Sequence, residues 1–313
     1  MPFPHPSRRK FIHSTTVLAL GAAVARTAPS LRAADQQVLF DGKTLKGWRA
    51  VPRLHVPPAP AFAQMGGDEL TSAVRAWHAG RAESRALREH TGRWEVVDGA
   101  IVGGQRPVDS NLGAYLLSER KFADFELELD ARPDWPADTG IMVRANELGS
   151  VGFQVLVDYR PKGGIGGIFG NSIGGFLAAP FTLDGEKEPN FGVKNLREGA
   201  RETQFKPLPM SHAATFAEFA KVWRPNDWNR FRIRCVGRLP IITTWVNGLK
   251  ICELDSAKID IPGYDPELVF KKIGRAGHIA FEVHDVNLKN PLGQDRWAQG
   301  AVCRWRNISV REL

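Results

Sequence analysis

The sequence predicts an all-β fold, a sandwich of two antiparallel sheets. Three observations favour it: many short segments alternate apolar and polar residues, turn signals separate these segments, and only one stretch has helical spacing. In FADFELELDARP (122–133), Phe125, Leu127 and Leu129 fall on one face and acidic residues fall on the other. This alternation is typical of strands with one buried face and one polar face.

The expected strands follow one another along the whole chain. LFDGKTLKGWRA begins with a short apolar strand and a tight turn, and WEVVDGAIVGG is a hairpin pattern with Asp98-Gly99 as its turn. A second hairpin turn is predicted at Asn247-Gly248. The segments predicted to contain strands are 39–50, 94–104, 122–133, 140–145, 151–160, 163–170, 230–254, 277–285 and 302–313.

Two stretches interrupt the strand pattern. Residues 68–90 place Leu70, Val74 and Trp77 at helical spacing, and we interpret them as a short helical insertion between the first strand and the next hairpin. Residues 184–227 are rich in proline, asparagine and charge, and we predict a long loop there. Both stretches either decorate the periphery or form the walls of a binding site.

Residues 1–34 have the features of an export signal. The run Ser7-Arg8-Arg9-Lys10-Phe11 matches the twin-arginine signature, and the apolar run 17–25 that follows is too short to span a bilayer core of roughly 30 Å. We therefore expect residues 35–313 to form the mature domain. It would be periplasmic or extracellular, without stable membrane insertion once the leader is removed.

The charge of the chain gives no reason to expect nucleic acid as a partner. The formal net charge is +8, and residues 1–34 contain five arginines and lysines and no acid. The +8 less these five leaves +3 for residues 35–313, without a clustered basic face of the kind that nucleic acid requires.

The chain has three cysteines, Cys235, Cys252 and Cys303. Cys235 and Cys252 flank a predicted hairpin and could pair, but a small odd number favours buried free thiols over a disulfide framework. The cysteine and histidine spacings do not predict a zinc site.

Polar side chains on three predicted strands indicate a shared site. If these strands lie in one curved sheet, side chains two residues apart share its concave face. That face would collect Arg144, Gln154, Asp158, Glu282 and His284. Carboxylates, an imidazole and a guanidinium suffice for proton transfer and for stabilising an anion. The alternative is that these residues form the solvated face of an ordinary antiparallel sheet.

A rival cluster lies on a different strand. Glu126, Glu128 and Asp130 resemble the acid cluster of laminarinase-type sandwich glucanases, which need two carboxylates flanking the glycosidic bond. Those enzymes have aspartate in the middle and glutamate last, and both positions differ here. We therefore favour a solvated convex strand, with Arg132 as a nearby counter-charge.

The order of the motifs resembles that of the 3-keto-disaccharide hydrolase domain family over residues 38–313. The motifs are LFDGKTLKGW, WEVVDGAIVG, DFELELDAR, TGIMVRA, GFQVLVD, GGIFG, DWNRFRIRCVG, WVNGLKI, GHIAFEVHD and WRNISVREL. Each is weak alone, but the ordered set is fairly specific. The resemblance implies a concanavalin A-like jelly roll. It also implies an enzyme that cleaves glycosides already oxidised to a ketone at C3.

This chain departs from the family pattern at several places, and two of them bear on the predicted site. Many members read Leu-Gln-x-His-Gly where this chain has Phe281-Glu282-Val283-His284-Asp285, so a glutamate replaces a glutamine. A polar position between Gln154 and Asp158 is occupied by Leu156.

The resemblance implies proton abstraction from C2 and elimination of the aglycone, followed by addition of water. We assign His284 as the base because the pKa of histidine suits this task. Glu282 or Asp158 would orient His284 or serve as the acid, and Arg144 and Arg306 would stabilise the enolate. The residues that we assign to substrate binding are Arg306, Gln154, Arg304 and Trp223.

The expected partner is a small oxidised carbohydrate, and no cofactor is assigned. Histidine and carboxylates could ligate a divalent metal, but the sequence does not establish one. Two other functions remain open. The same fold serves sugar-binding lectins, and a conventional glucanase would act through Glu126 and Glu128.

Overall fold

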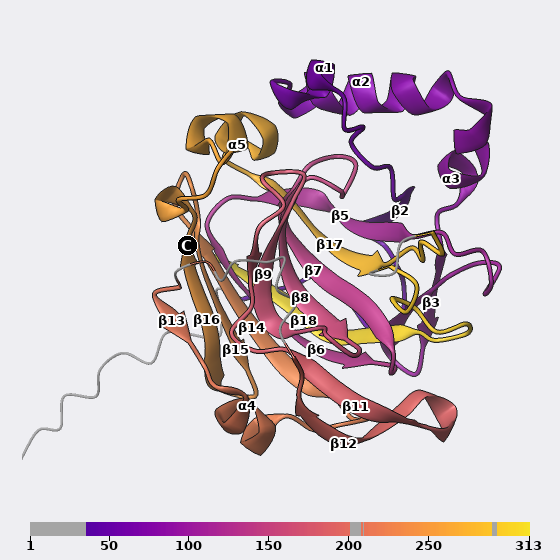
Figure 1. The fold of residues 1–313 in the computed structure, drawn as a ribbon, viewed down its shortest axis with the longest axis vertical. Coiled ribbons are helices and arrows are strands. Elements are labelled where there is room, and N and C mark those ends of the chain that lie inside the picture. The colour runs from indigo at the N-terminus through magenta and orange to yellow at the C-terminus, as the bar shows by residue number, and fades with distance from the viewer. Residues whose placement is uncertain (1–35, 201–207, 209, 290–292) are drawn as a thin grey trace, which may run out of the picture. The chain divides into compact units, whose positions relative to one another are not determined.

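Two antiparallel sheets pack face to face in the computed structural model, which describes residues 36–200, 208, 210–289 and 293–313 (Figure 1). This is the predicted all-β jelly-roll sandwich. The nine-stranded sheet among these residues has the order β13 (His212–Ala213), β16 (Leu249–Asp255), β15 (Ile241–Val246), β14 (Asn229–Val236), β6 (Phe125–Pro133), β18 (Cys303–Glu312), β4 (Ala100–Gly104) and β3 (Arg93–Val97), and β1 (Gln37–Val38) pairs with β18.

The seven-stranded sheet of the described residues carries the strands predicted to share a polar face. Its order is β10 (Leu177–Ala178), β9 (Ile165–Asn171), β8 (Gly152–Tyr159), β7 (Ala137–Ala145), β17 (Gly277–Val283), β5 (Ala114–Phe122) and β2 (Trp48–Pro52). The strands β8, β7 and β17 are therefore direct neighbours, as a shared site requires.

The core lies between the two sheets. The ring of Phe281 on β17 stacks on Trp305 of β18, with ring centroids 4.8 Å apart, and on Trp48 at 5.1 Å. Because side chains alternate along a strand, Phe281 and Val283 point into this core and Glu282 points out of the sandwich.

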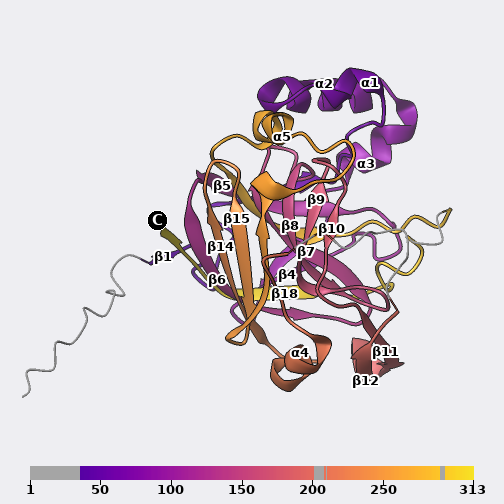
Figure 2. The same cartoon turned by 60° about the vertical axis from the view of Figure 1, so that its left-hand side comes forward.

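The helical insertion predicted at 68–90 is present. It contains α2 (Gly67–Ala79), a 3₁₀ turn (Ala82–Ser84) and α3 (Arg85–Glu89), preceded by α1 (Pro60–Ala63). Leu70 and Val74 of α2 are fully buried against the main core. These helices lie beside α5 (Pro266–Ile273) at one end of the sandwich (Figure 1, Figure 2).

The stretch 184–227 is not the long loop that we predicted. It contains most of the hairpin of β11 (Leu183–Glu188) and β12 (Gly192–Glu198), joined by a 3₁₀ turn (Pro189–Phe191), then β13 and α4 (Phe216–Val222). A capping box starts α4, because Thr215 accepts from the Glu218 amide and Glu218 accepts from the Thr215 amide. That Thr-x-x-Glu signal is visible in the sequence.

The three cysteines are free and buried, which confirms the prediction of free thiols. Burial raises the pKa of the Cys235 and Cys252 thiols to about 12.

Every helix within the described residues is too short or too polar to cross a bilayer. The predicted export signal, residues 1–34, lies outside the described residues.

Candidate functional site

The outer face of the seven-stranded sheet brings together polar residues from three adjacent strands. Asp138 on β7 lies directly opposite Asp158 on β8, and Met142 lies opposite Gln154. Glu282 comes from β17 on the other side of β7, and His284 follows it just beyond the end of the strand. The intervening residues point into the core, so alternation alone accounts for the common face.

The Glu282 carboxylate is completely buried and fully hydrogen-bonded. Its Oε1 atom accepts from Arg53 Nε at 2.7 Å and from the Tyr115 hydroxyl at 3.0 Å, and Oε2 accepts from Gln154 Nε2 at 2.6 Å. Gln154 Oε1 accepts in turn from Asn171 Nδ2 at 2.9 Å. Burial raises the pKa of Tyr115 well above its ordinary value, so the phenol keeps the proton that it donates. Glu282 therefore positions Arg53 and Gln154 beneath the site, and its buried carboxylate cannot contact a substrate.

Arg53 connects this buried carboxylate to His284. Its Nε bonds Glu282, its Nη1 bonds Asp285, and its Nη2 lies 3.0 Å from His284 Nε2. A guanidinium only donates hydrogen bonds, so Nε2 must accept and the proton of a neutral imidazole must sit on Nδ1. Nδ1 lies 2.7 Å from the Asp285 carbonyl oxygen and 3.0 Å from the Asp285 carboxylate. This arrangement fixes both the tautomer and the orientation of the ring.

The pKa values of the neighbouring carboxyl groups of Asp138 and Asp158 shift in opposite directions. Burial raises the pKa of Asp158 to about 7; the Arg160 guanidinium opposes this rise and the negative charge of Asp138 adds to it. Burial also acts on Asp138, but the positive charges of the imidazolium form of His284, of Arg296 and of Arg160 outweigh it and lower the pKa of Asp138. Two close carboxyl groups whose pKa values are pushed apart can hold one proton between them near neutral pH.

Ion pairs and the largely buried imidazole of His284 link these groups into one cluster. Asp138 Oδ2 lies 3.7 Å from His284 Nε2 and is bonded by Arg296. Arg160 Nε lies 2.8 Å from Asp158 Oδ1 and 3.8 Å from Asp138 Oδ2. The His284 side chain is 13% exposed and that of Asp158 is 11% exposed, so both reach solvent at the edge of the cluster.

The structure thus brings together Gln154, Asp158, Glu282 and His284, but it excludes Arg144. A β-bulge in β7 places His278 opposite Ala145 and Ala280 opposite Met142, and Arg144 has a φ of 53°. The extra residue reverses the alternation. Arg144 is fully buried away from the site, where Nη2 donates to Asp124 and to the Gly237 carbonyl oxygen at 3.1 Å each.

Three residues that we assigned to substrate binding also lie elsewhere. Arg304 and Arg306 lie on the outer face of the nine-stranded sheet, on the opposite side of the sandwich, where they pair with Asp134 and Asp130. Trp223 is a core residue that stacks on Phe219 with centroids 5.3 Å apart. None of these three side chains reaches His284.

Several residues of the cluster were missed from the sequence. Asp138 continues the alternation of β7 one residue before the motif TGIMVRA, and Arg160 continues that of β8, so both had a readable signal. Arg53, Asp285 and Arg296 lie in loops or just beyond strand ends, where no periodicity exists to place them.

The rival acid strand is an ion-paired surface. Glu126 pairs with Arg311 at 3.2 Å, Glu128 with Arg230, and Asp130 with Arg306 at 3.4 Å. The counter-charges therefore come from the two neighbouring strands. Arg132 is not one of them, because its guanidinium lies over the ring of Trp228 at 5.3 Å.

In the part of the chain that the structure describes, no group of three or more histidine, cysteine, aspartate or glutamate side chains is arranged to hold a metal ion.

A family model described as the 3-keto-alpha-glucoside-1,2-lyase-like domain matches residues 35–311. The chain belongs to this family. A comparison with curated proteins found no match. Two solved structures described as candidate glycosyl hydrolases of Parabacteroides distasonis ATCC 8503 are similar to it. One has 13% identity and a TM-score of 0.44 over 90% of this chain and 95% of its own. The other has 16% identity and a TM-score of 0.41 over 73% and 96%.

A third similar structure is a carbohydrate binding module of Bacillus subtilis, with 10% identity and a TM-score of 0.34 over 71% of this chain and 92% of its own.

Proposed function

We propose that this protein cleaves glycosides that carry a ketone at C3 of the sugar ring, by elimination across C1 and C2. The description of its family names this class of lyase. The observation that carries the proposal is the pairing of an imidazole held in place by hydrogen bonds at both ring nitrogens, His284, with a carboxyl group of pKa about 7, Asp158, in one cluster.

The chemistry requires two proton transfers. A ketone at C3 acidifies the proton at C2, and the aglycone oxygen at C1 is β to the carbonyl. A base removes the C2 proton to give an enolate. The C1–O bond then breaks as a C1–C2 double bond forms, and the leaving oxygen takes a proton from an acid. Water that adds to the resulting enone completes a net hydrolysis.

His284 is the base in this proposal. Its Nδ1 proton is held by Asp285, which leaves the Nε2 lone pair for the C2 proton, and Asp138 at 3.7 Å stabilises the imidazolium that forms. In the structure Arg53 Nη2 donates to the Nε2 lone pair of His284, so a bound substrate must displace this hydrogen bond. The released N–H group of Arg53 is then free to donate to the enolate oxygen.

Asp158 is the acid. A pKa of about 7 lets a large fraction of this carboxyl group hold its proton at neutral pH, which an ordinary aspartate does not do. Asp138 stays ionised beside it because Arg296 and Arg160 are close. The roles that the sequence assigned to Arg144 and Arg306 pass to the cations of the cluster, Arg53, Arg160 and Arg296.

The test compares a plain disaccharide with its 3-keto form, each incubated with residues 35–313, by release of the second sugar. Cleavage of the oxidised form alone is the expected result. Cleavage of the plain form would instead indicate a glucanase, and binding without turnover would indicate a lectin-like module.

A pair of histidine variants tests the base. His284→Asn should lower turnover of the 3-keto substrate by about 10²–10⁴-fold, the contribution of a positioned acid or base. His212→Asn is the matched control, since His212 lies on β13 of the other sheet and bonds a backbone carbonyl. Wild-type turnover by His284→Asn would exclude His284 as the base.

We also propose that the protein is exported by the twin-arginine route to the periplasm or the cell exterior. The support is the Arg8-Arg9 pair and the apolar run that follows it. Replacing both arginines with lysine should retain the protein in the cytoplasm, and cell fractionation measures this. Unchanged export would contradict the route.

A further inference from the structure

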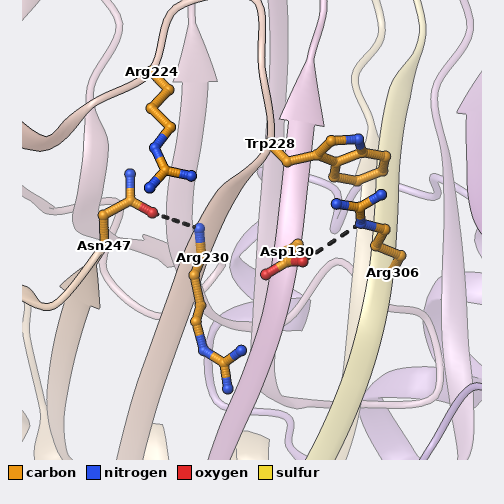
Figure 3. A pocket seen from close by; sticks show the side chains of 6 residues that line it. All are labelled: Asp130, Arg224, Trp228, Arg230, Asn247 and Arg306. Atoms are coloured by element: carbon orange, nitrogen blue, oxygen red, sulfur yellow. Dashed lines mark hydrogen bonds and ion pairs between the residues drawn. The ribbon is translucent and has the colours of Figure 1, made fainter.

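A cavity of about 320 Å³ lies on the outer face of the nine-stranded sheet. Figure 3 shows the six side chains that line it: Asp130, Arg224, Trp228, Arg230, Asn247 and Arg306. Its volume is within the range of about 300–1,000 Å³ that small-molecule sites occupy. Its lining contains three arginines and one acid, an excess of positive charge.

Strand register places the floor of this cavity on the side of the sandwich opposite His284. Asp130 on β6 lies directly between Arg230 on β14 and Arg306 on β18. The adjacent residues Leu129 and Trp305 point into the core. The cavity and the His284 cluster are therefore separated by both sheets.

The charges in the cavity are only partly paired. The guanidinium of Arg230 is occupied by Glu128, and Asp130 accepts from Asn307 Nδ2 at 2.7 Å and from Arg306 Nε at a longer 3.4 Å. Among the described residues, no carboxylate lies within ion-pair distance of the exposed Arg224 guanidinium. The lining thus keeps a positive excess.

The two least occupied guanidinium groups flank the same space. In Figure 3, Arg224 enters from one side and Arg306 lies on the other, with Asp130 between and below them. The Arg306 guanidinium is held over the Trp228 ring at 4.1 Å, which restricts its movement. Guanidinium groups on two sides of the cavity favour an anion such as a carboxylate, and Asp130 can accept hydroxyl hydrogen bonds from the same ligand.

We propose that this cavity binds a sugar acid, a monosaccharide unit that carries a carboxylate beside its hydroxyls. The carboxylate lies between Arg224 and Arg306, and the hydroxyls face Asp130. This site is separate from the elimination chemistry proposed for His284 and does not depend on it.

The test is a calorimetric titration of residues 35–313 with glucuronate, with glucose and with inorganic sulfate. The His284→Asn background keeps turnover out of the measurement. Saturable glucuronate binding that weakens with added salt is expected, with glucose at least about tenfold weaker. Equal binding of glucose and glucuronate, absence of binding, or sulfate binding as tight as glucuronate would each overturn the proposal.

Arginine variants locate the binding. Arg224→Gln and Arg306→Gln should each weaken glucuronate binding by about tenfold, as expected for loss of one charge-assisted hydrogen bond. The matched control is Arg75→Gln, an exposed arginine on α2. Circular dichroism confirms that each variant is folded. Glucuronate binding that both cavity variants leave unchanged would place the ligand elsewhere and refute the assignment.

Discussion

Asp158 illustrates how a neighbouring strand sets the chemistry of one residue. Its cross-strand partner is Asp138, and antiparallel register makes these two carboxyl groups share a face. Like charges this close disfavour double ionisation, and the arginines decide which group ionises. Because Asp138 has Arg296, Arg160 and His284 around it, Asp158 is the group left to hold a proton.

This arrangement predicts a pH-dependent stability difference. The pKa of Asp158 in the folded state, about 7, lies above its ordinary value of 3.8, so the folded state binds the extra proton between these pH values. Wild-type stability should therefore fall relative to Asp158→Asn as pH rises, by about 1.4 kcal/mol per unit up to pH 7, and then level off. Urea unfolding at pH 5, 6, 7 and 8 measures the difference. A constant difference from pH 5 to 8 would show that Asp158 does not titrate in this range.

Glu282 is one of the positions at which the sequence is expected to depart from the family pattern, and its hydrogen-bond partners show what its charge does. Arg53 and Tyr115 both donate to Oε1, and Gln154 donates to Oε2. In Glu282→Gln an amide group replaces one oxygen and turns one of these hydrogen bonds into a donor–donor contact. Gln154 cannot simply flip, because its Oε1 already accepts from Asn171.

We therefore predict that Glu282→Gln lowers the free energy of unfolding by about 1–3 kcal/mol, the cost of an unsatisfied buried group. Glu128→Gln, at the partly exposed Glu128–Arg230 pair, is the control and should change it by less than about 1 kcal/mol. Urea unfolding at pH 7 gives both values. Equal effects of the two substitutions would contradict the structural role of Glu282.

At the scale of elements, strand periodicity predicted which faces are polar, and a single bulge limited that prediction. Glu282, Gln154 and Asp158 lie where alternation puts them, whereas Arg144 does not, since one extra residue in β7 reverses the side. The sequence carries no glycine or other signal at Arg144 to announce a positive φ. Arg53 and Arg296 lie in loops, where the sequence has no strand periodicity, so only the tertiary structure could show that they complete the site.

The packing of α4 can be tested at Trp223, which the structure shows to be a core residue. It lies at the C-terminal end of this helix, packs against Phe219, Tyr159 and Phe231, and donates to the Tyr159 hydroxyl at 3.3 Å. Trp223→Ala should cost about 3–5 kcal/mol of stability, as for other large-to-small core substitutions. Trp245→Ala, a half-buried tryptophan under Arg232, should cost less. Urea unfolding compares them. A small loss of stability for Trp223→Ala together with a raised KM would show that Trp223 binds substrate and is not mainly a core residue.

At the scale of the whole molecule, one apolar core separates two polar faces with different chemistry. The His284 cluster lies outside one sheet and the arginine-lined cavity lies outside the other, with the Phe281–Trp305 stack between them. The sequence predicted both polar faces but attributed residues of both, such as His284 and Arg306, to one site. Alternation assigns a residue to a face of its own sheet and does not say which sheet.

Because the three cysteines are buried in this core, the reactivity of their thiols reports whether the whole domain is folded. Cys235, Cys252 and Cys303 are free and buried, and burial raises the pKa of each, so the reactive thiolate is scarce. A chromogenic disulfide reagent should therefore label no thiol rapidly in the native protein and three per chain in denaturant. A reducing agent should leave the melting temperature unchanged. Fewer than three thiols in denaturant without reductant, or a melting temperature lowered by reductant, would reveal a disulfide.

The hydrogen bond between Arg53 and Glu282 joins residues 229 positions apart. Contacts of such sequence separation form only after most of the chain has closed its loops, so they slow folding. A nascent chain therefore lacks the His284 cluster until almost all of it has been synthesised. We expect refolding to pass through species that have secondary structure but no assembled cluster, and turnover of the 3-keto substrate, the proposed activity, should return in the slowest kinetic phase.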